Sequence, residues 1–206
     1  MKTEKTMEIV CLDLEGVLVP EIWIAFAEET GIKELRRTTR EEPDYHKLMN
    51  WRMGILREHG LTLNDIQNTI AKIKPLDGAK EFLDELRSLT QVVILSDTFR
   101  EFASPLMKQL GWPTILCNNL ITDKDNYITG MQMRQEDGKR KAIDAFRSMG
   151  FRTFAAGDSY NDLTMIKKAD EGCLFRAPEN ILKEEPDLTL CTTYDQFLAR
   201  IKQFLR

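Results

Sequence analysis

Acidic and hydroxyl side chains follow three short apolar segments of this chain. The groups are Asp13-Leu14-Glu15 near the amino end, Ser96-Asp97-Thr98 in the middle, and Gly157-Asp158-Ser159-Tyr160-Asn161-Asp162 further on. A single aspartate at such a place commonly caps a helix or a turn. Capping requires neither two acids at positions i and i+2 nor a Gly-Asp-x-x-Asn-Asp cluster, so the whole set indicates a ligand site.

Gathered in one crevice, these carboxylates would repel one another unless a cation held them. Oxygen ligands without a Cys/His grouping favour Mg²⁺, which commonly accompanies phosphate and offsets its charge. Asp13 could then be a nucleophile that forms an aspartyl phosphate, and Ser96 could donate its hydroxyl to the phosphoryl group.

A fixed positive charge would come from Gly138-Lys139-Arg140-Lys141, at the start of a predicted helix. Each of these lysines, taken alone, is more commonly a solvated residue. The helix dipole nevertheless disfavours cations in a first turn, so this basic start is unusual without a phosphate nearby.

The apolar segments themselves predict the strands that position these groups. Residues 9–14, 92–96 and 153–157 are apolar at nearly every position, which is typical of parallel strands covered on both faces. Amphipathic helices are expected between and after them, at residues 79–89, 99–110, 142–149 and 194–204. Alternating strands and helices predict an α/β fold with a doubly wound, mostly parallel, Rossmann-like sheet. Such sheets bind ligands at the carboxyl ends of their strands, where all three polar groups lie.

Two stretches interrupt this alternation. Residues 20–75 have only helical patterns, at 21–30, 43–59 and 62–74, and the last helix opens with a Thr62-x-x-Asp65 capping signal. We therefore expect a small helical cap, residues 20–75, inserted after the first strand into a core formed by residues 1–19 and 76–206. In the second stretch, residues 120–134, Asp125-Asn126 separates two β-prone runs and predicts a hairpin.

Composition narrows the classes of protein and of partner. The 206 residues contain 33 Asp and Glu against 29 Lys and Arg, a net charge of −4, so no basic field favours nucleic acid. No apolar run is long enough to span a membrane. The polar start from Met1 to Thr6 lacks a signal-peptide pattern. Translation from Met1 or from Met7 fits equally well. The four cysteines contain no C-x-x-C pair, which excludes a zinc ribbon and favours a reducing cytoplasm. The oligomeric state is left open.

These motifs resemble, in order and spacing, those of the haloacid dehalogenase-like phosphohydrolases. The resemblance rests on Asp13-Leu14-Glu15-Gly16-Val17-Leu18, Ser96, Lys139 and Gly157-Asp158-Ser159-Tyr160-Asn161-Asp162. Over essentially its whole length the chain is similar to the phosphoserine phosphatase family. It is most similar to the type that also transfers the phosphoryl group to homoserine, through the stretches 13–21 and 96–99.

The resemblance implies a role for each matching residue. Asp13 would be the nucleophile, and Glu15 would exchange protons with the leaving group and with water. Mg²⁺ would bind the Asp13 side chain, the main-chain carbonyl of Glu15 and the Asp158 side chain, with Asp162 in support. Ser96 and Lys139 would hold the phosphoryl group. The other residues expected to contact the substrate are Glu21 and Arg52, for its amine and carboxylate, and Asp97 and Asn161.

Two departures from the family pattern bear on activity. Glu15 stands where the family usually has Asp, and its extra methylene moves the carboxyl group by about 1 Å, a displacement that can cost about a hundredfold in rate. We hypothesise that water attack is hampered, so that the phosphoenzyme survives until an alcohol such as homoserine accepts the phosphoryl group. Ser96-Asp97-Thr98 replaces the usual Ser-Gly-Gly beside the substrate, which leaves the specificity open.

Other interpretations compete with this one. The chain could be a phosphatase for another small phosphorylated metabolite, or a receiver-like module that carries a phospho-aspartate. A receiver would not need a helical lid, which favours an enzyme that encloses its substrate. A catalytically inactive binding protein is disfavoured by the complete set of chemical groups. Four bulky residues of the cap are interpreted as its apolar core: Trp23, Met49, Trp51 and Met53.

Overall fold

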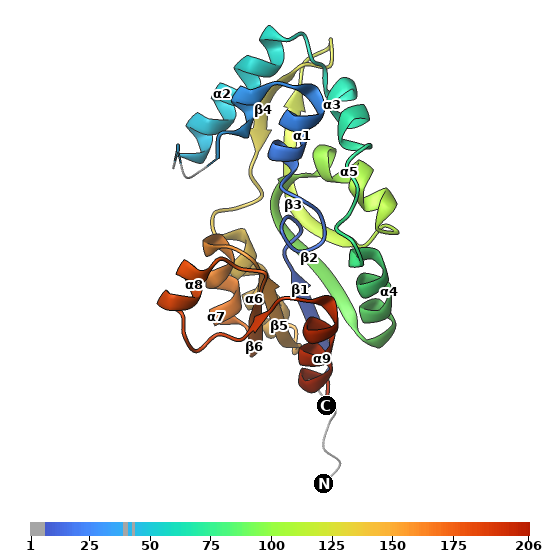
Figure 1. Cartoon of the computed structure of the whole chain (residues 1–206), viewed down its shortest axis with the longest axis vertical. Helices are drawn as coiled ribbons and strands as arrows, with labels where there is room; N and C mark the ends of the chain where they lie inside the picture. Colours follow the sequence, from blue (N-terminus) through green and yellow to red (C-terminus); the bar gives the residue numbers. More distant parts are fainter. Residues whose placement is uncertain (1–6, 39–40, 43) are drawn as a thin grey trace.

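The computed structural model describes residues 7–38, 41–42 and 44–206, and it contains a seven-stranded sheet in the order β4-β3-β2-β1-β5-β6-β7 (Figure 1). All neighbouring strands are parallel except the antiparallel pair β3–β4. This confirms the predicted fold class. Met1–Thr6, where a signal peptide was not expected, lies outside the described residues. The strands are β1 (Glu8–Leu12), β2 (Gln91–Phe99), β3 (Thr114–Thr122), β4 (Ile128–Gln132), β5 (Arg152–Gly157), β6 (Glu171–Phe175) and β7 (Leu190–Cys191).

The middle residues of the central strands are apolar on both sides because both faces of the sheet are covered. Side chains alternate between faces along a strand. Val10 and Leu12 of β1 therefore join one core cluster and Ile9 and Cys11 the other. The first cluster includes α4 (Ala79–Leu89), α5 (Arg100–Gln109) and α9 (Tyr194–Phe204); the second includes α6 (Gly138–Ser148), α7 (Leu163–Lys168) and α8 (Glu179–Glu184).

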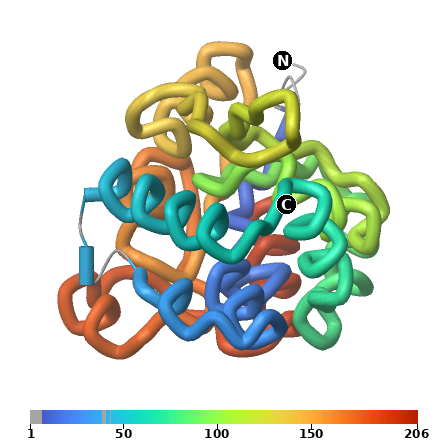
Figure 2. Tube along the Cα trace, turned by 90° about the horizontal axis from the view of Figure 1, so that it is seen from above, coloured from blue at the N-terminus to red at the C-terminus, as the bar shows by residue number. Residues whose placement is uncertain are grey.

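Between β1 and α4 the described residues form helices, preceded by one isolated β-bridge between Glu15 and Val19. The helices are α1 (Ile22–Thr30), the 3-10 turn η1 (Lys33–Arg36), α2 (Tyr45–Glu58) and α3 (Leu63–Ile70). Figure 2, seen from above, shows α2 crossing the top of the molecule. No helix in the described part of the chain is long and apolar enough to cross a membrane.

Two predicted helix bounds need correction. The middle helix starts at Tyr45 rather than at residue 43, which lies outside the described residues, because Asp44 caps it by accepting a hydrogen bond from the Lys47 N–H. The third helix has the predicted capping box but ends at Ile70 rather than at residue 74. Beyond it, the side chain of Gln109 donates to the carbonyl of Ile73, and Pro75 disfavours helix in the residue before it.

The predicted hairpin is formed by β3 and β4, and it reaches the inserted helices. Asn126 in its turn accepts hydrogen bonds from the backbone N–H groups of Leu63 and Asn64, at the start of α3. The guanidinium of Arg57 in α2 lies 5.3 Å from the Tyr127 ring centroid. The hairpin therefore supports the helices from the side of the sheet (Figure 1).

Candidate active site

The three polar groups meet at the carboxyl ends of β1, β2 and β5. Asp13 directly follows β1 and is bound to β5, because its backbone N–H donates to the carbonyl of Ala156 over 2.9 Å. Asp158 directly follows β5. The sheet thus fixes two acids side by side before any ligand binds.

Strand β2 presents Ser96 and Asp97 through a bulge. Its register with β3 jumps from Leu95 opposite Leu116 to Phe99 opposite Asn118, which leaves extra residues in β2. Bulges redirect side chains at the ends of strands. The buried Ser96 hydroxyl accepts from the Thr98 N–H at 3.2 Å, while Asp97 is exposed and accepts from the Asn161 amide at 3.0 Å.

Asp13, Asp158 and Asp162 form a cluster suited to a cation. Each offers a carboxylate oxygen, and the three oxygens lie within 4.8 Å of one another. Asp162 is already engaged: one oxygen accepts from Lys139, and the other accepts from the backbone of Asp158 and from both donors of Ser159. Oδ1 of Asp13 accepts a hydrogen bond from the backbone N–H of Leu14, and no described residue donates one to Oδ2. Asp13 and Asp158 therefore have carboxylate oxygens free to bind a cation.

Two glycines allow the backbone to approach these acids closely. Gly16 has φ +73°, and a Cβ there would lie 2.2 Å from Oδ2 of Asp158. A Cβ at Gly157 would lie 2.1 Å from Cγ of Asp162. Larger residues at either position would push a carboxyl group out of the cluster.

Lys139 lies inside the acidic cluster rather than in solvent. Its ammonium is 2.9 Å from Asp13, 2.6 Å from Asp162 and 4.0 Å from Asp97, and the residue is 4% exposed. Burial by itself would lower the pKa of Lys139, but the three carboxylates raise it above its ordinary value. Helical spacing was the signal that could have selected Lys139 over its basic neighbours, because it shares the buried face of α6 with Ala142 and Ile143.

Lys139 alone does not balance the charge of the cluster. Burial, followed by the charge of Asp162, raises the pKa of Asp13. Burial and the charges of Asp162 and Glu21 raise the pKa of Asp158 to about 7. Such shifts mark carboxylates that are held together without enough positive charge. A divalent cation would supply that charge and restore the ionised forms.

A family model described as haloacid dehalogenase-like hydrolase matches residues 7–170, the segment that contains every residue of this cluster. The chain belongs to the haloacid dehalogenase-like hydrolase family. A receiver-like signalling module is therefore not the correct class.

Individual relatives within the hydrolase family are close. A phosphoserine phosphatase of Pseudomonas syringae pv. tomato is 57% identical over 203 residues, 98% of this chain and 84% of that protein. Phosphoserine phosphatase ThrH of Pseudomonas aeruginosa is 59% identical over 189 residues, 92% of each protein. The solved structure of a phospho-aspartyl intermediate analogue of phosphoserine phosphatase superposes with a TM-score of 0.71 at 25% identity, covering 91% of this chain and 93% of that one.

The inserted helices of this hydrolase place two of the predicted substrate residues near the cluster. Glu21 is exposed at the start of α1, and its charge acts on both Glu15 and Asp158. Arg52 is buried in α2, with one terminal nitrogen donating to the Arg37 carbonyl at 2.7 Å and with Nε unpartnered. Its position was readable from the sequence, since it stands in the apolar stripe of Leu48, Met49, Ile55 and Leu56.

Glu15 is held by the insert rather than by the sheet. Its carboxylate accepts a hydrogen bond from the Ile22 N–H, at the start of α1, over 2.8 Å. Burial and the charge of Glu21 raise the pKa of Glu15 to about 7, so the group can exchange a proton near neutral pH.

Tyr45 lies near enough to Glu15 and Arg52 for their charges to act on it, which the sequence did not suggest. Burial, followed by the charge of Glu15, raises the pKa of its phenol, and the charges of Arg52 and Asp97 also act on it. Tyr45 therefore lies among residues from both the insert and the core. Its place in the first turn of a helix gave no sign of this.

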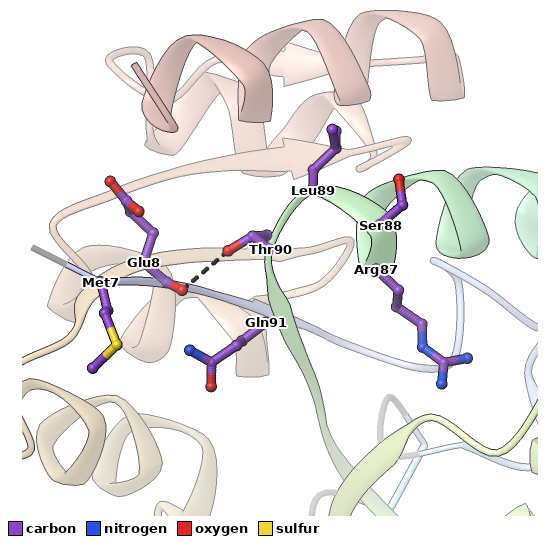
Figure 3. Close-up of a pocket in the computed structure, with 7 residues that line it drawn as sticks. All are labelled: Met7, Glu8, Arg87, Ser88, Leu89, Thr90 and Gln91. Atoms are coloured by element: carbon purple, nitrogen blue, oxygen red, sulfur yellow. Dashed lines mark hydrogen bonds between the residues drawn. The ribbon is translucent and has the colours of Figure 1, made fainter. Parts of the chain in front are cut away.

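The molecule is also hollowed at the opposite edge of the sheet. There a pocket of about 490 Å³ is lined by Met7, Glu8 and residues 87–91 (Figure 3). These residues lie at the amino ends of β1 and β2, where the hydroxyl of Thr90 donates to the carbonyl of Glu8. This pocket holds none of the clustered acids and is not the candidate site.

Proposed function

We propose that this hydrolase is an Mg²⁺-dependent phosphoserine phosphatase that works through an aspartyl phosphate on Asp13 and also transfers the phosphoryl group to homoserine. The observation that carries the proposal is the group formed by buried Asp13, Asp162 and Lys139 and half-buried Asp158, in which no described residue donates to Oδ2 of Asp13. Both close relatives are phosphoserine phosphatases, which supports the choice of phosphoserine as substrate.

The residues present fit Mg²⁺. The donors are carboxylate oxygens, and their pKa values are raised first by burial and then by the charge of Asp162, which a cation would offset. Asp13 and Asp158 would bind the ion with the carbonyl of Glu15, while Asp162 would orient Lys139 and the loop 158–159. When bound, the ion offsets the negative charge of the phosphoryl group.

The chemistry would proceed in two steps on Asp13. Its carboxylate attacks phosphorus, and the bond to the serine oxygen breaks while Glu15 gives that oxygen a proton. Lys139 and Ser96 hold the phosphoryl oxygens during the transfer. In the second step Glu15 removes a proton from the acceptor, whose oxygen displaces Asp13 from phosphorus.

Arg52 and Glu21 would anchor the amino-acid part of substrate and acceptor. The buried, unpartnered Nε of Arg52 supports a carboxylate ligand, since a guanidinium binds both oxygens of such a group. Homoserine would present its own carboxylate and ammonium to these residues and so position its hydroxyl, whereas water has no such anchor. This asymmetry supports transfer beside hydrolysis. Asp97 and Asn161, bound to each other at the rim, would close the other side.

We further propose that residues 20–75 act as a cap over a core formed by 1–19 and 76–206. The contact between Glu15 and α1, and the position of Arg52 in α2, support this division. The contacts of Asn126 with α3 suggest that the β3–β4 hairpin moves with the cap. The unpaired state of all four cysteines supports a reducing, cytoplasmic setting.

The test is to mix the purified protein with Mg²⁺ and phosphoserine and to measure free phosphate and phosphohomoserine side by side, with and without homoserine. We expect both products. No release under either condition would overturn the substrate assignment. Asp13→Asn should abolish both products, while Asp187→Asn, a matched change at an exposed acid, should leave both intact.

A further inference from the structure

Arg52 is a buried cation that forms no ion pair with any described residue. Its exposed fraction is 5%, and its polar contacts are the carbonyl of Arg37 at 2.7 Å and the thioether of Met49 at 3.8 Å. Buried guanidinium groups are normally paired with carboxylates. The structure here instead leaves Nε without a partner.

The face of this guanidinium is covered by an aromatic ring. Cζ of Arg52 lies 4.4 Å from the ring centroid of Trp23, in α1. An aromatic face attracts a cation without neutralising its charge or occupying its hydrogen-bond donors. A protein carboxylate in the place of this ring would compete with the carboxylate of a ligand for the guanidinium of Arg52.

Trp23 is itself fixed by rings on its other sides. Phe102 of α5 meets it edge-on at 5.2 Å with an interplanar angle of 73°, and Phe26 of α1 meets it at 6.3 Å. Phe102 is fully buried in the core cluster beneath the inserted helices. The plane of the Trp23 ring is therefore set by both the core and the insert.

We propose that Trp23 is a positioning residue that orients Arg52 and keeps its charge available for the carboxylate of an amino-acid phosphate. This inference rests on the proposed function, in which Arg52 binds that carboxylate. In this proposal Trp23 contributes to the preference for substrates that carry a carboxylate over phosphate esters that lack one. This role is additional to its packing in the apolar core of the insert.

The experiment compares phosphoserine with phosphoethanolamine, which has the same phosphate and ammonium but no carboxylate. In Trp23→Leu we expect KM for phosphoserine to rise about tenfold with kcat little changed, in line with the loss of one desolvated cation–π contact. The kinetic constants for phosphoethanolamine should not move, and Trp23→Phe, which keeps an aromatic face, should recover most of the loss. Trp112→Leu is the control, because Trp112 is 62% exposed and lies outside the inserted helices, so its loss should leave activity toward both substrates unaffected.

Four results separate the inference from the proposed function. A wild type that does not prefer phosphoserine, or an Arg52→Ala variant that keeps the preference, overturns the anchoring of the carboxylate by Arg52 and the inference with it. A Trp23→Leu variant that keeps the wild-type preference overturns the inference alone. Equal losses toward both esters in Trp23→Leu, with a fall in kcat, overturn it as well, because they indicate a merely structural role.

Discussion

The carboxylate of Glu15 accepts a hydrogen bond from the backbone N–H of Ile22 over 2.8 Å. Glu15 follows the first strand of the sheet, and Ile22 begins the first inserted helix, so this bond joins the proposed acid–base group to the proposed cap. The N-terminus of a helix favours a negative charge. The bond thus stabilises the ionised carboxylate at the start of α1.

Shortening this side chain is expected to change the balance between hydrolysis and transfer. In Glu15→Asp the carboxyl group loses one methylene and moves by about 1 Å, which can alter a rate by about a hundredfold. Its contact with the Ile22 N–H should weaken, and hydrolysis should gain on transfer at least severalfold. Free phosphate and phosphohomoserine, measured together, give the ratio. Glu15→Gln, which keeps the length but cannot exchange protons, should lose both activities. An unchanged ratio in Glu15→Asp would remove the link between this glutamate and transfer.

Removing the charge of Lys139 is expected to affect both activity and folding. Lys139→Met keeps the length of the side chain but leaves Asp13 and Asp162 buried without their cation. We expect kcat to fall by at least about a hundredfold, and the metal-free protein to lose about 3 kcal/mol of unfolding free energy. Phosphate release and urea unfolding measure the two effects. Lys141→Met, a change at the exposed neighbour on the same helix, should have neither effect; equal losses in the two variants would contradict the account.

Gly16 is expected to be required for the metal site rather than for the fold. In Gly16→Ala the new Cβ would lie 2.2 Å from Asp158 Oδ2, so that carboxyl group must move and Mg²⁺ affinity should fall at least about tenfold. Gly31→Ala is a matched control, because Gly31 has the same φ of +73° but no atom within 4 Å of a Cβ. Both variants should lose about 1 kcal/mol of stability from backbone strain. Titration of activity with Mg²⁺ should separate them, and equal Mg²⁺ affinities would show that Asp158 is not a ligand.

Mg²⁺ is expected to stabilise the protein more at higher pH. The pKa of Asp158 is about 7 in the folded protein, against an ordinary value of 3.8. Between these values the folded state binds more protons than the unfolded state, so the contribution of this group to stability falls as the pH rises toward 7. Above that window the ionised carboxylate is available to a cation. The rise in Tm on adding Mg²⁺ should therefore be larger at pH 7.5 than at pH 5.5.

Asp158→Asn provides the control for this pH dependence. Asparagine does not titrate, so the variant should lose both the Asp158-dependent slope of Tm with pH and most of the Mg²⁺ effect. A wild-type protein that gained as much from Mg²⁺ at pH 5.5 as at pH 7.5 would contradict the assignment.

Three central strands, the hairpin and most helices could be predicted from the sequence because their signals are local. Apolar runs marked β1, β2 and β5, and the Thr62-x-x-Asp65 signal marked the start of α3. The short strands β6 and β7 and the helices α7 and α8 carry too few residues for a clear period and were not predicted. The carboxyl ends of the predicted strands then brought the acids together, as parallel topology requires.

The parts of the site that could not be predicted depend on contacts between distant segments. Nothing near Gly16 in the sequence indicates that Asp158 will press against it, and the bulge in β2 exists only in its pairing with β3. Trp23 was interpreted as apolar core because the partner that distinguishes it, Arg52, lies 29 positions away on another helix. Long-range geometry, rather than residue type, assigns these roles.

The most direct test of the account is to trap the phosphoenzyme. The protein is mixed with Mg²⁺ and phosphoserine, quenched in acid within the first turnover, digested, and its phosphopeptides are identified by mass spectrometry. We expect phosphate on the peptide that contains Asp13, a signal that disappears in Asp13→Asn and decays faster when homoserine is present. Release of phosphate by an Asp13→Asn variant, or a phosphate carried on any other residue, would contradict the account.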